Sequence, residues 1–153
     1  MTTSTAIDPQ QACAELEQRD PLGCLRWGAE QFGDGFALTT SFGIQAAVSL
    51  HLISQLERSV PVIWVDTGYL PPETYHYAET LTRRLGLEVH VAQAELSPAR
   101  MEALHGRLWE TGEVNDLETY LRIRKVEPLD RAMEQLGVRC WASGVRGRQT
   151  DHR

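Results

Sequence analysis

The stretch FALTTSFGIQAAVSL, residues 36–50, decides the fold because it joins a short strand to a helix through a small polar loop. Its first five residues are apolar enough for a buried strand, and the loop that follows has one glycine and no lysine. The helix expected over 43–56 carries Ile44, Val48 and Leu52 at i, i+4 and i+8, so we expect these side chains on one face. Free backbone N–H groups at the start of such a helix can bind an anion.

Two common nucleotide-binding loops are excluded at this position. Neither G-x-x-x-x-G-K-[ST] nor G-x-G-x-x-G occurs in TTSFGIQ, residues 39–45. Thr40 and Ser41 can still donate from their hydroxyl groups, and Gly43 lets a ligand approach the backbone closely. An anion site and a plain strand-to-helix turn capped by Thr or Ser both remain open for this loop.

Strands and helices alternate over the rest of the chain, after two leading helices with Asp-Pro starts. The leading helices are expected over 9–19 and 21–32, the strands over 36–40, 60–66, 87–92 and 138–144, and the remaining helices over 43–56, 72–86, 97–106 and 126–137. The segment 107–116 gives no clear signal. This order predicts an α/β fold with a parallel sheet and right-handed crossovers.

Three polar motifs follow predicted strands, and all three therefore belong at the carboxyl edge of the sheet. They are TTSFGIQ, DTGYLPPET and GVRGRQTDHR. Open parallel sheets bind ligands beyond this edge, where the strand order reverses. Asp66 and Thr67 are expected to cap a turn or to hold a ribose hydroxyl, and Glu73 to cap a helix or to contact a ligand.

Length, composition and charge exclude several classes of protein. The 153 residues, 42% hydrophobic and 24% charged, predict one globular domain in the cytoplasm, without a signal peptide or a membrane helix. The formal charge of −6 argues against a nucleic-acid binder. Cys13, Cys24 and Cys140 have no C-x-x-C spacing and are expected as reduced thiols, and the histidines have no metal-ligand spacing, so no metal site is predicted.

Positive charge gathers at two places in this acidic chain, which suits a small anionic ligand. The basic residues are Arg122, Arg124 and Lys125 in one cluster and Arg146, Arg148 and Arg153 in the other. Lys125 is expected just before a helix, where a cation gains nothing from the helix dipole, so a ligand anion is one reason for its presence. The alternative for both clusters is a solvated helix face and a solvated tail.

Taken together, five blocks resemble the sulfonucleotide reductases, most closely the phosphoadenylyl-sulfate (PAPS) reductases. The blocks are TTSFGIQAAV, VDTGYLPPETY, GRLWETG, KVEPLDRAM and WASGVRGRQTDHR, in the order of that family. The resemblance implies an adenine-nucleotide α-hydrolase-like fold with a modified pyrophosphatase (PP) loop, truncated at its C-terminus. Within a single domain, 1–34 would form leading helices and 35–153 the sulfonucleotide-binding core.

The resemblance also assigns substrate-binding residues. Ser41, Phe42 and Gly43 would line the nucleotide pocket, and Asp66, Thr67 and Gly68 would lie near the adenosine. Lys125, Arg146 and Arg153 would hold the phosphosulfate and its neighbouring phosphate. Gly144 and Gln149 complete the expected set, and Thr150 replaces a serine that usually follows this glutamine.

The implied reaction is the reduction of PAPS to sulfite and adenosine 3′,5′-bisphosphate in sulfate assimilation, with thioredoxin or glutaredoxin as electron donor. The adenylyl-sulfate (APS) reductases carry a Cys-Cys pair for an iron–sulfur cluster where this chain has Tyr120 and Leu121, so no cluster is expected. The family's nucleophilic Cys lies in an E-C-G-L-H motif that the printed sequence lacks. Cys140, expected in a buried strand beside Trp141, is not a credible substitute.

Several alternatives remain open from the sequence. The chain is expected to be the N-terminal part of a reductase, as a fragment or a natural truncation, that produces no sulfite by itself. The other possibilities are a non-catalytic sulfonucleotide-binding module, an APS reductase and an ATP pyrophosphatase relative, the last disfavoured because its loop needs a second glycine and an aspartate. A homodimer is expected from the family alone.

Overall fold

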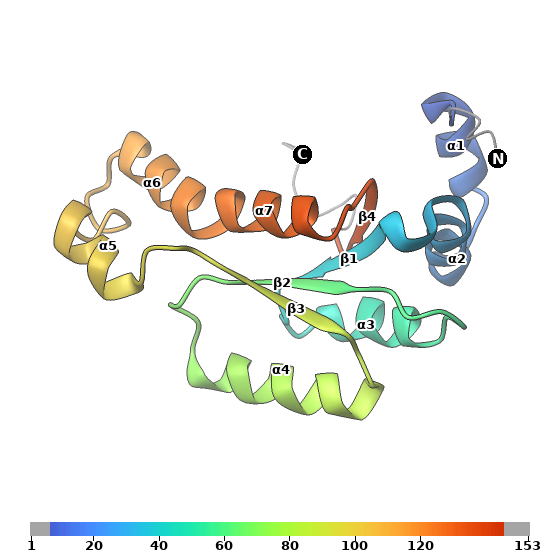
Figure 1. Cartoon of the computed structure of the whole chain (residues 1–153), viewed down its shortest axis with the longest axis horizontal. Helices are drawn as coiled ribbons and strands as arrows, with labels where there is room; N and C mark the ends of the chain where they lie inside the picture. The colour runs from blue at the N-terminus through green and yellow to red at the C-terminus, as the bar shows by residue number, and fades with distance from the viewer. Residues whose placement is uncertain (1–6, 146–153) are drawn as a thin grey trace.

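The structure is a computed structural model that describes residues 7–145 (Figure 1). Its elements alternate as the sequence predicts, with a strand before each of several helices. They are α1 (Pro9–Leu16), α2 (Pro21–Phe32), η1 (Gly33–Gly35), β1 (Phe36–Thr40), α3 (Ala46–Ser54), β2 (Val62–Asp66), α4 (Pro72–Leu85), β3 (Val89–Gln93), α5 (Pro98–His105), α6 (Val114–Leu121), η2 (Arg122–Val126), α7 (Glu127–Gln135) and β4 (Cys140–Ser143).

The strands form one parallel sheet in the order β3-β2-β1-β4. The chain moves outward from β1 to β2 and β3, and it then returns to place β4 on the other side of β1. The strand order therefore reverses between β1 and β4, and this pair holds the register Leu38↔Ala142 and Thr39↔Ser143. The predicted parallel α/β architecture is confirmed.

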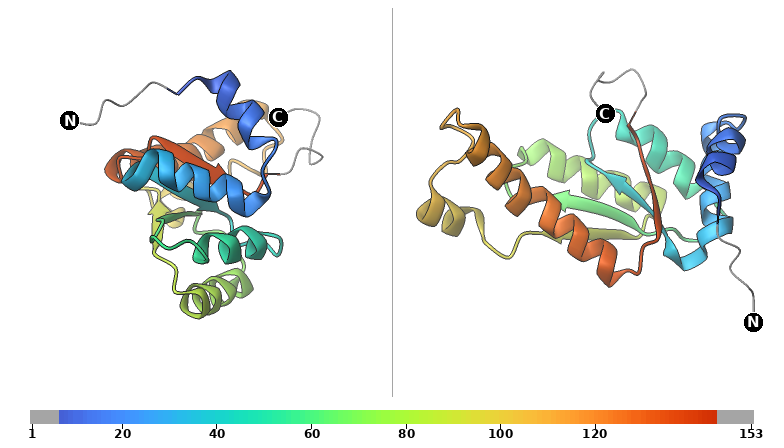
Figure 2. Two further views of the ribbon diagram at one scale, coloured as in Figure 1. Left: turned by 90° about the vertical axis from the view of Figure 1, so that its right-hand side faces the viewer. Right: turned by 90° about the horizontal axis from the view of Figure 1, so that it is seen from above.

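Helices cover both faces of the sheet, and the alternation of side chains along the strands explains how (Figure 2). Leu38, Val62 and Trp64 point to the face that carries α2, α3 and α4. Ala37 and Ile63 point to the opposite face, where residues of α7 cover β2 and β3. Strands buried on both faces need the nearly continuous apolar sequence of 60–66.

The buried face of α3 differs from the predicted one. Ile44 is 92% exposed and precedes the helix, and Val48 is 66% exposed, whereas Leu50 and Ile53 enter the core. The cause is the residue before Gly43: Phe42 buries its ring, and the chain then turns, so that the helix begins only at Ala46. The predicted sharing of one helix face by Ile44, Val48 and Leu52 is therefore wrong for Ile44, which lies outside the helix.

The helix predicted over 126–137 is part of a longer helical run, from α6 through the π-helical η2 into α7. Pro128 lies in the first turn of α7 and has no N–H to bond to a carbonyl four residues back. The chain accommodates it by widening the preceding turn, in which Glu127 N–H donates to the Arg122 carbonyl five residues back. Lys125 lies inside this run, so its predicted position just before a helix is wrong.

The fourth strand is less buried than expected. In the described part of the chain, β4 lies at the edge of the sheet, with β1 as its partner, and its Trp141 side chain is 57% exposed. Cys140 is half-buried on the other face. No helix within residues 7–145 is both long and apolar enough to cross a membrane.

Candidate functional site

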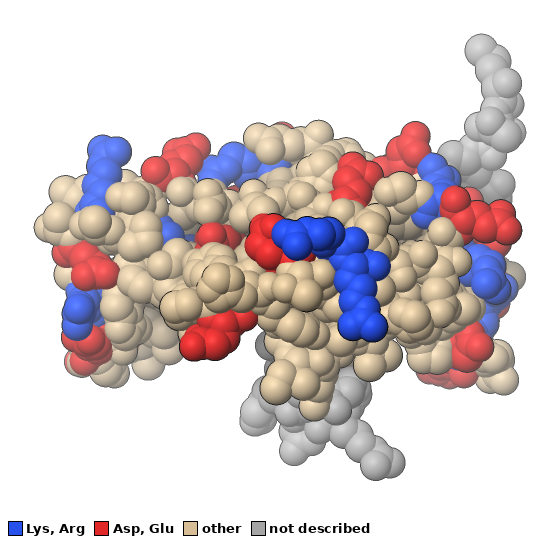
Figure 3. All heavy atoms as spheres, turned by 90° about the horizontal axis from the view of Figure 1, so that it is seen from below, with Lys and Arg blue, Asp and Glu red and all other residues tan. Residues whose placement is uncertain are grey.

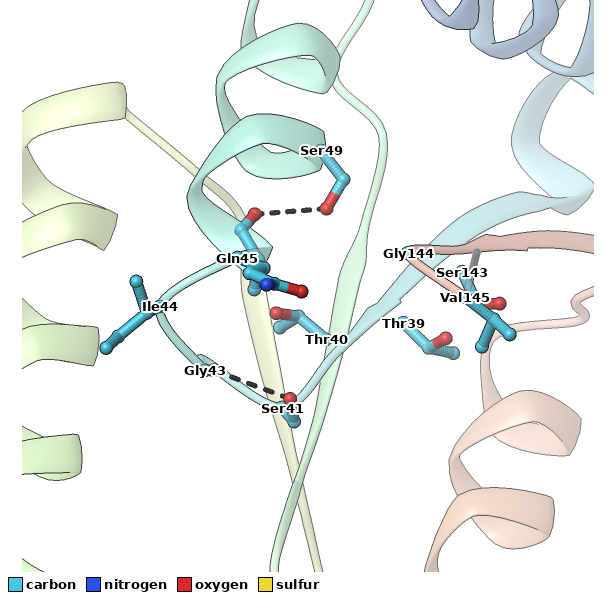
Figure 4. A pocket seen from close by; sticks show the side chains of 11 residues that line it. Thr39, Thr40, Ser41, Gly43, Ile44, Gln45, Ser49, Ser143, Gly144 and Val145 are labelled. Carbon is cyan, nitrogen blue, oxygen red and sulfur yellow. Dashed lines mark hydrogen bonds between the residues drawn. The ribbon is translucent and has the colours of Figure 1, made fainter. Parts of the chain in front are cut away.

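A cavity of about 660 Å³ opens between the carboxyl ends of β1 and β4 (Figure 4). This is the point where the strand order reverses, so the loops that follow the two strands diverge and leave space between them. Its walls are the end of β1 with the loop after it, the first turns of α3, and the end of β4. The lining residues are Thr39, Thr40, Ser41, Gly43, Ile44, Gln45, Ala46, Ser49, Ser143, Gly144 and Val145.

Hydroxyl groups and backbone groups share this lining with the apolar residues Ile44, Ala46 and Val145. Figure 4 shows Thr39 and Ser143 on one side of the cavity and Ser41 and Gly43 on the other, with Ile44 directed away from them. The start of α3 has no side-chain cap, because Gln45 makes no capping hydrogen bond. Uncapped N–H groups at a helix start attract anions through their partial positive charge.

The loop after β1 is held by its central residue. Phe42 has φ 51°, in the left-handed region, and its buried ring meets Trp64 edge-on at 5.0 Å between ring centroids. Its N–H donates to Thr40 Oγ1 at 3.1 Å, and Gly43 N–H donates to Ser41 Oγ at 3.4 Å. Ser41 and Gly43 therefore face the cavity, while the Phe42 side chain, also expected in the pocket, lies in the core.

Asp66 ends β2 and is fully engaged by protein groups. Its oxygens accept hydrogen bonds from Gly68 N–H at 2.8 Å, Tyr75 O–H at 2.7 Å and Gln93 Nε2 at 2.9 Å. Burial raises the pKa of this carboxyl, but the hydrogen bonds and the charge of Arg124 outweigh burial, so the pKa lies below its ordinary value. The predicted need for partners at Asp66 is met inside the protein.

Thr67 and Gly68 are held as tightly as Asp66. The Thr67 carbonyl accepts hydrogen bonds from two nitrogens of Arg124, with Nε at 2.8 Å. Gly68 has φ 76°, and a Cβ there would lie 2.6 Å from Pro98 Cγ and 2.9 Å from Arg124 Nη2. Neither these two residues nor Asp66 lines the cavity. Their predicted contact with adenosine stays a prediction.

Arg124 is the residue that the sequence did not single out. It lies 2% exposed among protein groups, although its neighbours Arg122 and Lys125 are exposed. A solvated helix face is therefore the wrong interpretation for Arg124. The side chains of Arg122 and Lys125 lie at the surface, and the ligand role of Lys125 stays a prediction. Arg124 is the third residue of the π-helical turn η2, and the sequence around it contains no local signal for its burial.

The remaining predicted binding residues divide into two groups. Gly144 lines the cavity, and Lys125 is exposed on η2 and does not line it. Arg146, Gln149 and Arg153 lie outside the described residues, as do Arg148 and Thr150. Their roles stay predictions.

All three cysteines lie in the described part of the chain, and none lines the cavity. Burial raises the pKa of the Cys140 thiol, which lowers its thiolate fraction. Cys13 is exposed on α1, and Cys24 Sγ donates to the Leu16 carbonyl at 3.5 Å. These environments give no thiol that is both activated and placed at the cavity.

Aromatic side chains fill the region of Tyr120. Its ring lies 5.5 Å from Trp109 and 6.2 Å from Tyr69, and these two rings are 4.7 Å apart. Burial, together with a hydrogen bond from its hydroxyl to Glu102, raises the pKa of Tyr69 to about 12. Within residues 7–145, no group of three or more His, Cys, Asp or Glu side chains is placed to hold a metal ion.

Charge on the α4 side of the molecule is mixed (Figure 3). Acidic and basic side chains are interspersed over this face, with one small group of basic side chains near its centre and no extended basic area. Nucleic-acid binding needs a basic surface that follows the phosphates. This face therefore offers no such surface, in keeping with the acidic composition.

Comparison with known proteins gives consistent results. Residues 35–153 match the family described as phosphoadenosine phosphosulfate reductase domain. The chain is 54% identical over 140 residues to the phosphoadenosine 5′-phosphosulfate reductase of Synechococcus sp., which covers 92% of this chain and 60% of that protein. It is 50% identical over 151 residues to the protein of the same name from Synechocystis sp., with 99% and 61% covered. The chain thus spans about 60% of the length of these relatives.

Solved structures show the same fold. The crystal structure of phosphoadenylyl-sulfate (PAPS) reductase from Candida auris, a phosphate complex, aligns with a TM-score of 0.78 at 27% identity, covering 93% of this chain and 70% of that one. NMN synthetase from Francisella tularensis aligns at 0.53 with 18% identity, covering 87% and 53%, and shows likeness of fold alone. The predicted adenine-nucleotide α-hydrolase-like fold is confirmed.

Proposed function

The chain belongs to the phosphoadenosine phosphosulfate reductase domain family, and on this premise we propose that it binds 3′-phosphoadenylyl sulfate (PAPS) as the substrate-binding part of such a reductase. The observation that carries the proposal is the cavity between β1 and β4, which is lined by Ser41, Gly43 and Gly144. These residues belong to two separate sequence blocks of the family resemblance, and the fold brings them to one cavity.

The chemistry of this cavity suits an anionic nucleotide. Hydroxyl groups of Ser41 and Thr40 and the first turn of α3, which no side chain caps, supply hydrogen-bond donors without a formal charge. Formal positive charge would come from Lys125, Arg146 and Arg153, as the resemblance implies. Arginine is suited to this task because its planar group pairs with two phosphate or sulfate oxygens at once.

The proposed reaction of the whole enzyme is the reduction of PAPS to sulfite during sulfate assimilation, on the route to cysteine in the cytoplasm. A cysteine thiolate attacks the sulfur of the sulfonate group, the bond from that sulfur to the phosphate oxygen breaks, and adenosine 3′,5′-bisphosphate leaves. The enzyme then carries an S-sulfocysteine. Reduced thioredoxin or glutaredoxin attacks this group, becomes a disulfide, and releases sulfite and the free thiol.

The attacking thiolate is proposed to be the Cys of the E-C-G-L-H motif, which the printed sequence does not contain. The half-buried Cys140, whose pKa is raised by burial, supports this assignment because it is a poor nucleophile away from the cavity. The aromatic side chains around Tyr120 support a site without an iron–sulfur cluster, since two thiolate ligands would be needed at residues 120 and 121.

Titration calorimetry of the chain with PAPS, APS and adenosine 3′,5′-bisphosphate tests the proposal. We expect the two ligands with a 3′-phosphate to bind and APS to bind more weakly. An absence of heat at millimolar concentrations of all three ligands contradicts the proposed function. A parallel assay with PAPS and reduced thioredoxin is expected to release no sulfite from this chain.

A second candidate is a sulfonucleotide-binding module that holds the ligand without reacting. The observation that favours it is a cavity with no thiol among its lining residues. Adding a synthetic peptide or second chain that carries the E-C-G-L-H motif separates the two. Sulfite release with that addition favours the reductase, whereas binding without any release favours the module.

A further inference from the structure

Arg124 is an internal cation that holds parts of three elements together. Its Nε donates to the Thr67 carbonyl after β2, and its Nη1 donates to the Leu96 carbonyl after β3. Its guanidinium also lies 5.6 Å from the centre of the Tyr69 ring. These contacts use the forked donors of the guanidinium, which a lysine ammonium, a single point of charge, does not reproduce.

In the π-helical turn, a buried charged side chain stands next to an exposed one. Ile123 and Arg124 are both buried, while Lys125 and Val126, the next residues along η2, are exposed. The widened turn that accommodates Pro128 thus divides adjacent residues between the protein interior and the surface. Arg124 and Lys125 leave the same turn in different directions.

The loop after β2 meets this turn through Arg124. The Asp66 carboxylate receives the Gly68 N–H, and the Thr67 carbonyl receives Arg124, so the loop is held from both sides. The absence of a Cβ at Gly68 lets the guanidinium approach, because a Cβ would lie 2.9 Å from Nη2. The position of the loop after β2 relative to the π-helical turn therefore depends on the contacts of Arg124.

We propose that Arg124 is a positioning residue for substrate binding: its buried guanidinium fixes the turn that presents Lys125 relative to the loop of Thr67 and Gly68. The inference rests on the proposed function in assigning an anionic ligand to Lys125. It goes beyond that function because Arg124 is enclosed by protein groups and acts through its neighbour. Burial of the guanidinium leaves Lys125 as the exposed cation of the turn's Arg-Lys pair.

Amide hydrogen exchange tests the positioning without any ligand. In the unsubstituted chain, the Gly68 and Tyr69 amides, which bond to Asp66 and Thr67 side chains, should open together with the Glu127 amide of the π-helical turn. Arg124→Lys should speed exchange at all three by about tenfold or more, and the matched Arg122→Lys variant, at an exposed position, should not. Separate opening of loop and turn in the unsubstituted chain overturns the proposal, even if Arg124→Lys does not fold.

Exchange also distinguishes positioning from general support of the fold. The Val62 amide, which donates to the Glu88 carbonyl at 2.8 Å in the sheet, should be accelerated by a clearly smaller factor than the Gly68 amide in Arg124→Lys. An equal acceleration at Val62 and at Gly68 means that Arg124 supports the whole fold and has no specific positioning role. That outcome also overturns the proposal.

Binding of adenosine 3′,5′-bisphosphate gives the second readout, through a double-mutant cycle. Arg124→Lys and Lys125→Gln should each weaken binding by about tenfold. The double variant should bind about as weakly as either single variant, because Arg124 acts through Lys125. A double variant weakened by the product of both factors contradicts the proposal. If the unsubstituted chain does not bind, the proposed function fails, and hydrogen exchange alone decides the role of Arg124.

Discussion

The loops after β1 and β2 leave neighbouring parallel strands, yet one is open and the other is closed. Thr40 and Trp64 are register partners, so both loops start at the same edge of the sheet. In the first loop, Ser41 and Gly43 are exposed at a cavity of about 660 Å³. In the second loop, Asp66 and Thr67 are each 6% exposed and their polar groups are satisfied by the protein.

The difference follows from what stands beside each loop. The loop after β1 borders β4, across the reversal of strand order, where neighbouring loops diverge. The loop after β2 lies on the side where α5, the segment after β3 and η2 converge, and Pro98 and Arg124 fill the space against Gly68. Small polar residues after a strand can therefore form a ligand site, or they can form a brace, by which we mean a loop whose polar groups are bonded to the protein around it. Their neighbours in the fold determine which of the two they form.

Removing the brace should produce the largest effect on stability. Arg124→Met leaves the Thr67 and Leu96 carbonyls and the Asp66 charge without their buried cation, which should lower the free energy of unfolding by about 3–5 kcal/mol. The exposed neighbour is the control: Arg122→Met removes a surface ion pair with Glu127 and should cost about 1 kcal/mol or less. Urea denaturation measures the free energy of unfolding of both variants. An equal loss in the two variants would mean that Arg124 does not hold the loop after β2 in place.

A glycine in each loop gives a matched pair of substitutions. Gly68→Ala places a Cβ at φ 76° and 2.6 Å from Pro98 Cγ, so we expect a loss of about 2–4 kcal/mol. Gly43→Ala meets nothing closer than Ser41 Oγ at 3.5 Å and should leave stability unchanged or raise it by up to about 1 kcal/mol. Thermal unfolding of the two variants is the measurement. A clear loss of stability in Gly43→Ala would contradict our description of the loop after β1 as open.

The fold could be predicted from sequence to a large extent because local signals agree with it. Asp8 and Asp20 cap their helices as expected, each before a proline, and β1 begins and ends at the predicted residues. The failures lie where tertiary packing overrides periodicity. Phe42 takes a left-handed conformation to bury its ring, which delays α3, and no period in the sequence reports this.

The site could be predicted only in part. Motif position placed Ser41, Gly43 and Gly144 at the carboxyl edge, and the strand order then brought them to one cavity. The burial of Arg124 beside the exposed Lys125 was not predictable, because it depends on the widened turn and on carbonyls that lie 28 and 57 residues away in sequence. Contacts over such separations leave no local pattern.

The pH dependence of stability sharpens the comparison at Asp66. Because its folded pKa lies below the ordinary value, Asp66 stabilises the fold above pH of about 4 and loses this contribution as pH falls through the folded pKa. Asp66→Asn should lower the free energy of unfolding at pH 7 by about 1–3 kcal/mol, since an amide cannot accept from Gly68, Tyr75 and Gln93 as the carboxylate does. Urea titrations from pH 3 to 7 should show the gap between variant and parent closing toward low pH. A gap that is independent of pH means that the carboxylate is not the stabilising form.

Ser41→Ala should have the smallest effect on stability and a distinct effect on binding. The Ser41 hydroxyl accepts one long hydrogen bond, 3.4 Å from Gly43 N–H, in an exposed loop, so its removal should change the free energy of unfolding by less than about 0.5 kcal/mol. Adenosine 3′,5′-bisphosphate should bind about fivefold more weakly, the effect of losing one hydrogen bond to a ligand. Calorimetry and urea denaturation of the same sample separate the two effects. A loss of stability as large as that of Asp66→Asn, with binding unchanged, means that the loop after β1 is also a brace, and the cavity beside it would then need another explanation.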